Sequence, residues 1–293
     1  MNRNKTLCVV LHYGEENETW NCLESIVNND FLDIIVVDND PAQKIELPEK
    51  FKNMAKIFRT GGGVGFAKAN NLTVSTFRNT SHRSVLFLNN DTVVLEDALV
   101  RLRYLLESKD IGAVGPCMPF MSHPEQIWAC GGSVKKIRIS IGGLREIKQT
   151  EPYDVDYLPG AAILCKLSVF DHVGGMPDKY FLAFEEAEFA LEIRKLNLRI
   201  MVDPMAKILH KVGMSSDRKP MYIYNGIRNR LKFGTYLWGK PIGFSLAAFM
   251  TLTGQRRSKI LGFRIWFRAV LDEMRNLPLD RNALQNVEYN FGE

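Results

Sequence analysis

The sequence alternates short apolar runs with longer segments of helical spacing, and this alternation limits the fold more than any other feature. Helical patterns such as NETWNCLESIVNN (17–29) and LEDALVRLRYLLES (95–108) separate the apolar runs. The runs are TLCVVLHY (6–13), DIIVVDND (33–40), AKIFRT (55–60), SVLFLNND (84–91) and IGAVGPCM (111–118). Strands that alternate with helices at this rhythm form βαβ units. The sequence therefore predicts an α/β fold, with a mostly parallel sheet covered by helices on both faces.

Polar residues stand where several of these apolar runs end. They are His12–Tyr13, Asp38–Asp40, the glycine-rich stretch 60–71 and Asn89–Asp91. In open α/β sheets, ligands bind beyond the carboxyl ends of the strands. We therefore expect these groups to meet at one edge of the sheet and to form a ligand site there.

Asp91 ends the run VLFLNND and is a candidate metal ligand. A hard cation such as Mg²⁺ or Mn²⁺ prefers oxygen ligands, and it usually takes one or two carboxylates together with substrate phosphates. A turn, or a helix cap ahead of LEDAL, would explain the same residue. His210 follows AKIL and is isolated in the sequence, and by itself such a histidine is more often structural than a ligand.

The loop TGGGVGFAKANN (60–71) opens a predicted helix. Its glycines permit close approach of the backbone to a ligand, and a helix N-terminus favours phosphate. The loop lacks the lysine-serine pair of a P-loop, and it follows the third strand rather than the first, which argues against a dinucleotide fingerprint. A plain tight turn explains these residues equally well.

The segment FLAFEEAEFALEIRKLN (181–197) predicts an acidic helix. Glu185, Glu188 and Glu192 share one face at i, i+3 and i+7, whereas Glu186 points elsewhere. A solvated charged face is the ordinary explanation. The apolar FLAF before it could instead raise the pKa of a carboxyl group toward that of a general base. Two short strands, RIMVDP (199–204) and AKILHKVG (206–213), are predicted to follow.

Charge is distributed unevenly along the 293 residues. Residues 218–293 hold 13 Lys or Arg against 5 Asp or Glu, and residues 1–217 hold 25 against 28. A near-neutral body with a basic end favours an anionic surface partner, either membrane or nucleic acid. Five cysteines without CxxC spacing suggest reduced thiols in the cytoplasm. The N-terminus turns polar after one strand, so no signal peptide is expected.

The C-terminal region contains two apolar segments. PIGFSLAAFMTLTG (241–254) is shorter than the ~20 residues that span a bilayer. KILGFRIWFRAVLDEMRN (259–276) predicts an amphipathic helix with arginines among Trp and Phe, which suits a membrane interface. We therefore expect a helical C-terminal extension that attaches peripherally to the inner face of the cytoplasmic membrane. Packing on the rest of the chain, or in a homodimer, is the alternative.

Taken together, the motifs resemble those of the family-2 inverting glycosyltransferases of the GT-A fold, close to their bacterial rhamnosyltransferase-like branch. The likeness runs from about Leu7 to Phe233. It rests on eight segments in the expected order: VVLHY, IIVVDND, GGGVGFAKANN, VLFLNNDTVV, LPGAAILCKLSVFDHVGGMPDKYF, FEEAEFALEIRKLNLRI, ILHKVGMSS and YNGIRNRLKF. The resemblance implies a catalytic domain over residues 1–217, with a nucleotide-sugar half at about 1–115 and an acceptor half at about 116–217. A basic helical region, 218–293, would follow.

The resemblance also implies roles for residues that match the family's motifs. His12 and Tyr13 would border the base of the donor, and Asp38 would bond its pyrimidine ring. The other positions that would shape the nucleotide-sugar pocket are Gly65, Phe66, Asn70, Asn89, Asn90, Gly160 and Ala161. Asp91 would meet a divalent metal, and His210 would complete the metal–diphosphate site.

Glu186 matches the catalytic base of the family, with Glu185 beside it. The base would deprotonate an acceptor hydroxyl in a single displacement at the anomeric carbon, which inverts its configuration. The family pattern Glu-Asp-x-Asp reads EEAE (185–188) here, and misplacement by ~1 Å can cost about a hundredfold in rate. The chain also has Lys68-Ala69 where the family usually has two glycines, and Glu192 where an arginine is common.

The resemblance favours dTDP-L-rhamnose as the donor, with UDP-sugars second, and a glycan or lipid-linked acceptor. A nucleotidyltransferase would share the sheet and the metal, but its activating loop with Gly, Arg and Lys near the first strand is absent. A nucleic-acid-binding protein would explain the basic end but would have no use for Asp38, Asp91 and the glutamates together, so no nucleic acid partner is expected. A non-catalytic nucleotide-sugar-binding or scaffold protein of the same fold is the remaining alternative, and Glu186 in place of aspartate is its main support.

Overall fold

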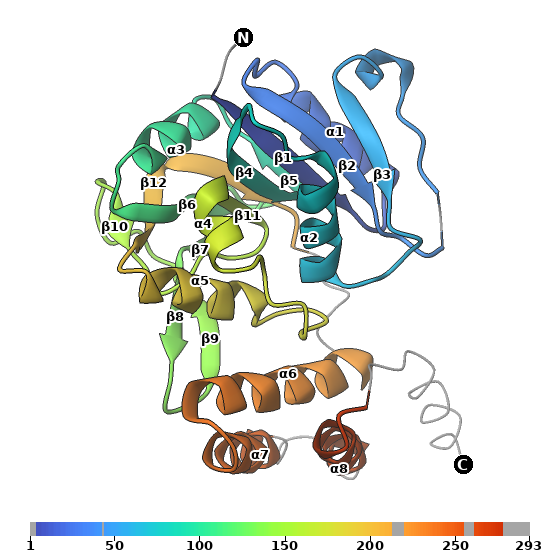
Figure 1. The fold of residues 1–293 in the computed structure, drawn as a ribbon, viewed down its shortest axis with the longest axis vertical. Helices are drawn as coiled ribbons and strands as arrows, with labels where there is room; N and C mark the ends of the chain where they lie inside the picture. The colour runs from blue at the N-terminus through green and yellow to red at the C-terminus, as the bar shows by residue number, and fades with distance from the viewer. Residues whose placement is uncertain (1–3, 43, 213–219, 255–260, 278–293) are drawn as a thin grey trace. The chain divides into compact units, whose positions relative to one another are not determined.

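The computed structural model describes residues 4–42, 44–212, 220–254 and 261–277. The chain divides into two compact units (Figure 1). The first comprises residues 1–134, 141–179 and 185–212, and the second comprises 135–140, 180–184 and 213–293. The end of the motif ILHKVGMSS, and residues 218–219, 255–260 and 278–293 of the predicted C-terminal region, lie outside the described residues.

The first unit is built on a mixed sheet. Its strands are β1 (Lys5–His12), β2 (Leu32–Asp38), β3 (Ala55–Arg59), β4 (His82–Asn89), β5 (Thr92–Val94), β6 (Ile111–Pro119), β7 (Ile127–Cys130), β10 (Tyr153–Asp154), β11 (Ala162–Lys166) and β12 (Arg199–His210). Their order is β10-β12-β6-β11-β4-β1-β2-β3, with β5 paired to β12 and β7 to β6. A separate hairpin joins β8 (Gly132–Lys135) to β9 (Ser140–Gly143).

Parallel pairing dominates the part of the sheet that the sequence predicted as βαβ units. β1 is parallel to β2 and β4, β2 is parallel to β3, and β12 is parallel to β6. β11 runs antiparallel between β4 and β6. The carboxyl ends of β1, β2 and β4 therefore share an edge with the amino end of β11, and the predicted mostly parallel sheet is confirmed.

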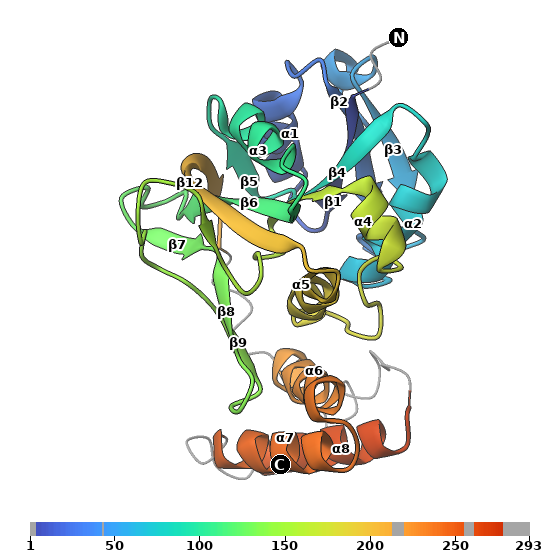
Figure 2. The same cartoon turned by 60° about the vertical axis from the view of Figure 1, so that its left-hand side comes forward.

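Helices cover both faces of this sheet (Figures 1 and 2). They are α1 (Glu16–Ile26), α2 (Phe66–Phe77), α3 (Ala98–Leu106), α4 (Leu167–His172) and α5 (Glu185–Lys195), with a short 3-10 helix, η1 (Glu49–Phe51). α1 and α3 share one hydrophobic core with alternate residues of β1, β2 and β4. On the other face, Phe87 of β4 contacts Phe170 of α4, and Phe170 contacts Phe189 of α5, at ring-centroid distances of 5.6 and 6.0 Å. Burial on both faces explains why these strands are continuously apolar.

The two short strands predicted after the acidic helix are one strand, β12. Its register on β6 shifts between Asp203 and Lys207, so the predicted break is an irregularity within a strand. Asp203 stabilises this irregularity, because its carboxylate accepts a hydrogen bond from the Met205 amide (2.9 Å) and pairs with Arg101 (3.0 Å). Pro204 lacks an amide hydrogen and suits the same place. β12 can therefore continue from its pairing with β6 to its pairing with β5.

All five cysteines are free thiols, and all are fully buried. They lie on β1, α1, β6, β7 and β11, and they are Cys8, Cys22, Cys117, Cys130 and Cys165. Burial raises the pKa of the Cys22 thiol to about 12 and also raises the pKa values of Cys8 and Cys165. Burial and a raised pKa both suppress thiolate chemistry in the folded state.

The second unit contains three helices within its described residues: α6 (Pro220–Trp238), α7 (Ile242–Gly254) and α8 (Leu261–Met274). Both α7 and α8 pack on α6. α6 and α7 approach closely through two glycines, since a Cβ on Gly243 would lie 1.9 Å from the carbonyl oxygen of Gly234. Among the described helices, none combines the length and the apolar character that crossing a membrane requires.

Gly62 lies in the turn between β3 and α2, where the backbone conformation requires glycine. It adopts φ +98°, and a Cβ there would lie 2.7 Å from Cα of Pro41. We expect Gly62→Ala to lower the free energy of unfolding by about 1–3 kcal/mol, because the alanine must adopt a strained backbone conformation against the main chain. Denaturant titration measures this difference. Gly142→Ala is the matched control, since a Cβ on Gly142 meets nothing within 4 Å; equal losses in both variants would contradict the expectation.

Candidate functional site

Strand register brings most of the predicted site residues to one edge of the sheet. His12 of β1 lies opposite Asp38 of β2, and Leu11 lies opposite Asn89 of β4. His210, at the end of β12, lies opposite Thr92, the first residue of β5, so it reaches the residue next to Asp91. The convergence predicted from the strand ends is present, and a histidine that looked isolated in the sequence belongs to it.

Asp38 has a buried carboxylate oxygen at this edge. The residue as a whole is 4% exposed. Oδ2 accepts a hydrogen bond from the Ile45 amide (3.3 Å) and lies 3.6 Å from Nε of Arg59. Oδ1 is buried and has no hydrogen-bond partner in the described part of the chain. A buried acceptor without a partner is costly, so this oxygen suits a donor group of a bound ligand.

His12 is the buried centre of a hydrogen-bond chain. Its Nδ1 lies 2.7 Å from the hydroxyl of Thr19, and that hydroxyl accepts a bond from the amide of Asn90 (3.1 Å). The Asn90 amide also lies 3.4 Å from the carbonyl oxygen of Tyr13, whose own side chain is 60% exposed. Burial lowers the pKa of His12, against the opposing effect of Asp38 and other nearby carboxylates. Nε2 is buried and without a partner among the described residues, so the ring has one nitrogen available to a ligand.

The glycine loop is held against the end of β2 by Asn39. The Asn39 carbonyl accepts a hydrogen bond from Gly63 N (2.6 Å), and its side-chain oxygen accepts bonds from Val64 N (3.0 Å) and the Thr60 hydroxyl (2.8 Å). Gly65 then caps α2 with φ +95°. The loop conformation therefore depends on a residue next to Asp38, which couples the two predicted parts of the pocket.

The start of α2 meets the small-residue loop before β11. A Cβ on Gly160 would lie 3.3 Å from the ring of Phe66, and the Ala161 carbonyl accepts a hydrogen bond from Asn89 N (3.0 Å). Asn70 is 1% exposed, and neither atom of its amide has a hydrogen bond within the described residues. Lys68, at a position where the family usually has glycine, is exposed. Its bulk therefore does not fill the buried side of the helix.

Asp91 and His210 form the pair predicted to hold a metal. Oδ1 of Asp91 lies 3.3 Å from Nε2 of His210, and the Asp91 carbonyl accepts a bond from Lys211 N (2.9 Å). The ring of Trp128 lies against the imidazole at a centroid distance of 4.3 Å. One carboxylate and one imidazole fit a cation that also takes substrate phosphate oxygens. The described residues contain no cluster of three or more His, Cys, Asp or Glu side chains that would hold a metal alone.

The glutamates of α5 are not a solvated face. Glu185 is 2% and Glu188 is 6% exposed, and Glu188 pairs with Lys179 at 2.6 Å. The ordinary explanation of these glutamates, a solvated charged face, therefore does not hold for these two positions. Burial raises the pKa of the Tyr157 phenol, and the negative charge of Glu186 adds to this effect. Because the loop from Tyr157 leads directly to Gly160 and Ala161, Glu186 is linked to the predicted sugar side of the pocket.

Sequence reasoning missed three residues of the site: Thr19, Trp128 and Tyr157. Thr19 positions His12 and Asn90 through hydrogen bonds, and the ring of Trp128 lies against His210. Tyr157 is influenced by the charge of Glu186. These three had no local signal, because their roles depend on tertiary structure. Asn39 lies within the predicted segment Asp38–Asp40, but its hydrogen bonds to the glycine loop were not predicted.

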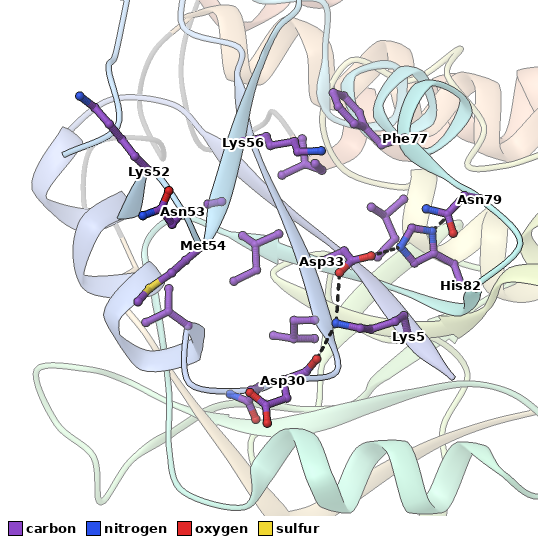
Figure 3. Close-up of a pocket in the computed structure, with 17 residues that line it drawn as sticks. Lys5, Asp30, Asp33, Lys52, Asn53, Met54, Lys56, Phe77, Asn79 and His82 are labelled. Atoms are coloured by element: carbon purple, nitrogen blue, oxygen red, sulfur yellow. Dashed lines mark hydrogen bonds and ion pairs between the residues drawn. The ribbon is translucent and has the colours of Figure 1, made fainter. Parts of the chain in front are cut away.

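A cavity of about 460 Å³ lies at the opposite edge of the sheet, near the first residues of β1 to β4 (Figure 3). Figure 3 shows Lys5 between Asp33 (3.3 Å) and the Asp30 carbonyl (2.6 Å), with His82 bonded to the other oxygen of Asp33 (3.0 Å). None of the predicted site residues lines this cavity. Lys5, Asp33 and His82 of this cavity pair with one another, and the candidate site remains at the carboxyl edge.

Solved structures share this fold. The structure of GalNAc-T7 with UDP, GalNAc and Mn²⁺ matches 98% of this chain with a TM-score of 0.67 at 12% identity, and this chain spans 57% of that protein. A mannosyltransferase from Pyrobaculum calidifontis, in complex with GDP-Man and Mn²⁺, matches with a TM-score of 0.58 at 14% identity over 98% of this chain and 79% of that one. The fold is that of the GT-A glycosyltransferases.

The chain belongs to glycosyl transferase family 2, whose model matches residues 8–174. Among curated proteins, it is 22% identical to the dTDP-rhamnosyl transferase RfbF of Shigella flexneri, over 94% of this chain and 97% of that protein. It is 23% identical to the rhamnosyltransferase WbbL of Escherichia coli, over 69% of this chain and 81% of that one. The resemblance seen in the motifs is therefore confirmed at the level of the family.

His12 makes the stability of the protein depend on pH. Its pKa in the folded state is below the ordinary value of about 6.5, so below that pH the unfolded chain binds more protons than the folded one. This group therefore makes the protein lose stability as the pH falls below about 6.5. His12→Asn retains a polar atom near Thr19 and should show a smaller loss between pH 7 and pH 5. Thermal unfolding across this range measures the difference.

His123→Asn is the matched control, because the His123 side chain is 65% exposed. It should follow the wild-type pH profile. If His12→Asn and wild type lose stability in parallel on acidification, the burial of His12 is not the cause.

Proposed function

We propose that the protein is an inverting transferase that moves a hexosyl group, with rhamnose favoured, from a nucleoside-diphosphate sugar to a glycan or lipid-linked acceptor. The observation that supports this best is a group of buried atoms at one sheet edge that lack hydrogen bonds in the described part of the chain. They are Oδ1 of Asp38, Nε2 of His12 and Nδ1 of His210. Buried polar atoms are costly unless a ligand or water meets them.

The donor's base would bind against β1 and β2. The free oxygen of Asp38 is an acceptor, so it would take the N3–H of thymine or uracil, and it does not distinguish the two. The names of the curated relatives favour a dTDP-linked rhamnose as donor, with UDP-sugars second. The methyl group of thymine and the 2′-hydroxyl of uridine would have to be distinguished elsewhere in the pocket.

The diphosphate would lie near Asp91 and His210. These two residues would hold a divalent metal, Mg²⁺ or Mn²⁺, and the bound metal supplies positive charge against the leaving nucleoside diphosphate. The two neighbouring structures that contain Mn²⁺ support this proposal.

Glu186 would act as the base. Its carboxylate would take the proton of an acceptor hydroxyl, whose oxygen bonds to the anomeric carbon while the bond from that carbon to the diphosphate oxygen breaks. Attack from the face opposite the leaving group inverts the configuration. The acceptor would then be bound within residues 116–217.

A panel of dTDP- and UDP-sugars tests the proposal. The readout is the nucleotide released when the protein hydrolyses a donor in the absence of an acceptor. We expect one donor to react in the presence of Mg²⁺ or Mn²⁺ and to stop reacting with EDTA. Asp91→Asn should lower the rate about a hundredfold, because it weakens the charge that stabilises the leaving group. Asp97→Asn, an exposed aspartate six residues along the chain, is the matched control and should retain activity.

Glu186→Gln tests the base separately, with a sugar acceptor present. Loss of a general base costs about 10²–10⁴-fold in rate, and binding of the donor, followed by thermal shift, should be unchanged. Glu192→Gln on the same helix is the control. If nucleotide sugars shift the melting temperature but no donor is turned over by the wild type, the protein is a non-catalytic binder of the same fold.

A further inference from the structure

The second unit exposes an unusual amount of apolar surface on α7 and α8. α7 contains no charged residue along its 13 residues. Its buried residues include Ala247 and Thr251, whereas Ile242 is 67% and Phe249 is 64% exposed. The close glycine contact between α6 and α7 fixes which side of α7 faces α6. Among the described side chains of α7, the exposed ones are Ile242, Ser245 and Phe249, so its outward side is uncharged and mostly apolar.

α8 repeats this arrangement. Ile265 and Ala269 are buried against the unit, while Phe263, Phe267 and Met274 are 54%, 52% and 62% exposed. Phe263 stacks on Phe267 with ring centroids 6.5 Å apart, so the aromatic residues form a continuous exposed strip. Large apolar side chains that are exposed together mark an interaction surface.

The charges around this surface have one sign. The acidic residues of the described part of 220–277 are Asp272 and Glu273 alone, and both are turned inward. Asp272 accepts a hydrogen bond from the Tyr224 hydroxyl (2.7 Å), and Glu273 pairs with Arg228 (2.9 Å). The exposed charged residues on and beside α7 and α8 are basic: Lys240, Arg264, Arg268 and Arg275. Of these, Arg268 pairs with Asp272 at 2.8 Å.

We propose that this apolar and basic surface of α7 and α8 docks on an anionic lipid bilayer. Phenylalanines flanked by arginines suit the boundary between headgroups and acyl chains, and the basic residues complement anionic lipids. A second copy of the chain is a poorer occupant, because a two-fold contact through this surface would bring the same cations together. The proposal does not depend on the reaction, and it would place the protein at a membrane surface, where a lipid-linked acceptor would be within reach.

Co-flotation with vesicles tests the proposal with the full chain. The vesicles contain phosphatidylglycerol and phosphatidylcholine, or phosphatidylcholine alone, at low and high salt. We expect binding to the anionic vesicles that weakens with salt. The double variant Phe249→Ser/Phe267→Ser should bind the anionic vesicles more weakly, by a factor of about ten or more. The double variant Lys240→Glu/Arg275→Glu should lose about tenfold and no longer prefer phosphatidylglycerol.

Tyr104→Ser is the matched control, since Tyr104 of α3 is 80% exposed but lies in the first unit, and it should bind vesicles as the wild type does. Unchanged thermal unfolding and donor turnover show that the variants are folded. Absence of wild-type binding to anionic vesicles, or binding that neither double variant reduces, overturns the proposal. A wild-type dimer that becomes monomeric in Phe249→Ser/Phe267→Ser without any vesicle binding assigns the surface to a second copy instead.

Discussion

The register of β1 against its two neighbours is the constraint on which the site depends. Backbone hydrogen bonds set His12 opposite Asp38 and Leu11 opposite Asn89. Side chains alternate between the faces of a sheet, so a slip of one residue would move His12 away from Asp38 and turn it to the other face of the sheet. The backbone pairing that stabilises the sheet therefore also fixes the positions of the residues proposed to bind a nucleotide.

A second constraint joins distant parts of the chain. β12 is far from β5 in the chain, yet its last residue, His210, pairs with Thr92, the first residue of the strand that follows Asp91. The irregularity at Asp203 and Pro204 changes the register of β12 on β6 and still lets the strand continue. The proposed metal pair is therefore a product of tertiary structure, whereas the Asp38 pocket is built from neighbouring strands.

Sequence patterns predicted the parts of the site that follow from strand ends. The predicted runs 6–13, 33–40 and 84–91 extend one or two residues beyond β1, β2 and β4, which end at His12, Asp38 and Asn89. The ends were placed this closely because a buried strand needs a long apolar stretch and its end is visible as a change in polarity. The burial of Glu185 was not visible, since acidic residues at helical spacing look the same in solvent and in a pocket. The effect of Glu186 on the pKa of Tyr157 was equally hidden, because it depends on how segments far apart in the chain pack. Motif resemblance supplied the roles that periodicity could not.

The five buried cysteines allow local unfolding of the protein to be followed by chemical modification of its own thiols. They are spread over β1, α1, β6, β7 and β11, so a membrane-permeant alkylating reagent would reach each thiol only when the element that covers it separates from its neighbours. The order in which the five thiols become modified would then rank the elements of the sheet by local stability. No residue would need to be introduced, and the same measurement would apply inside living cells.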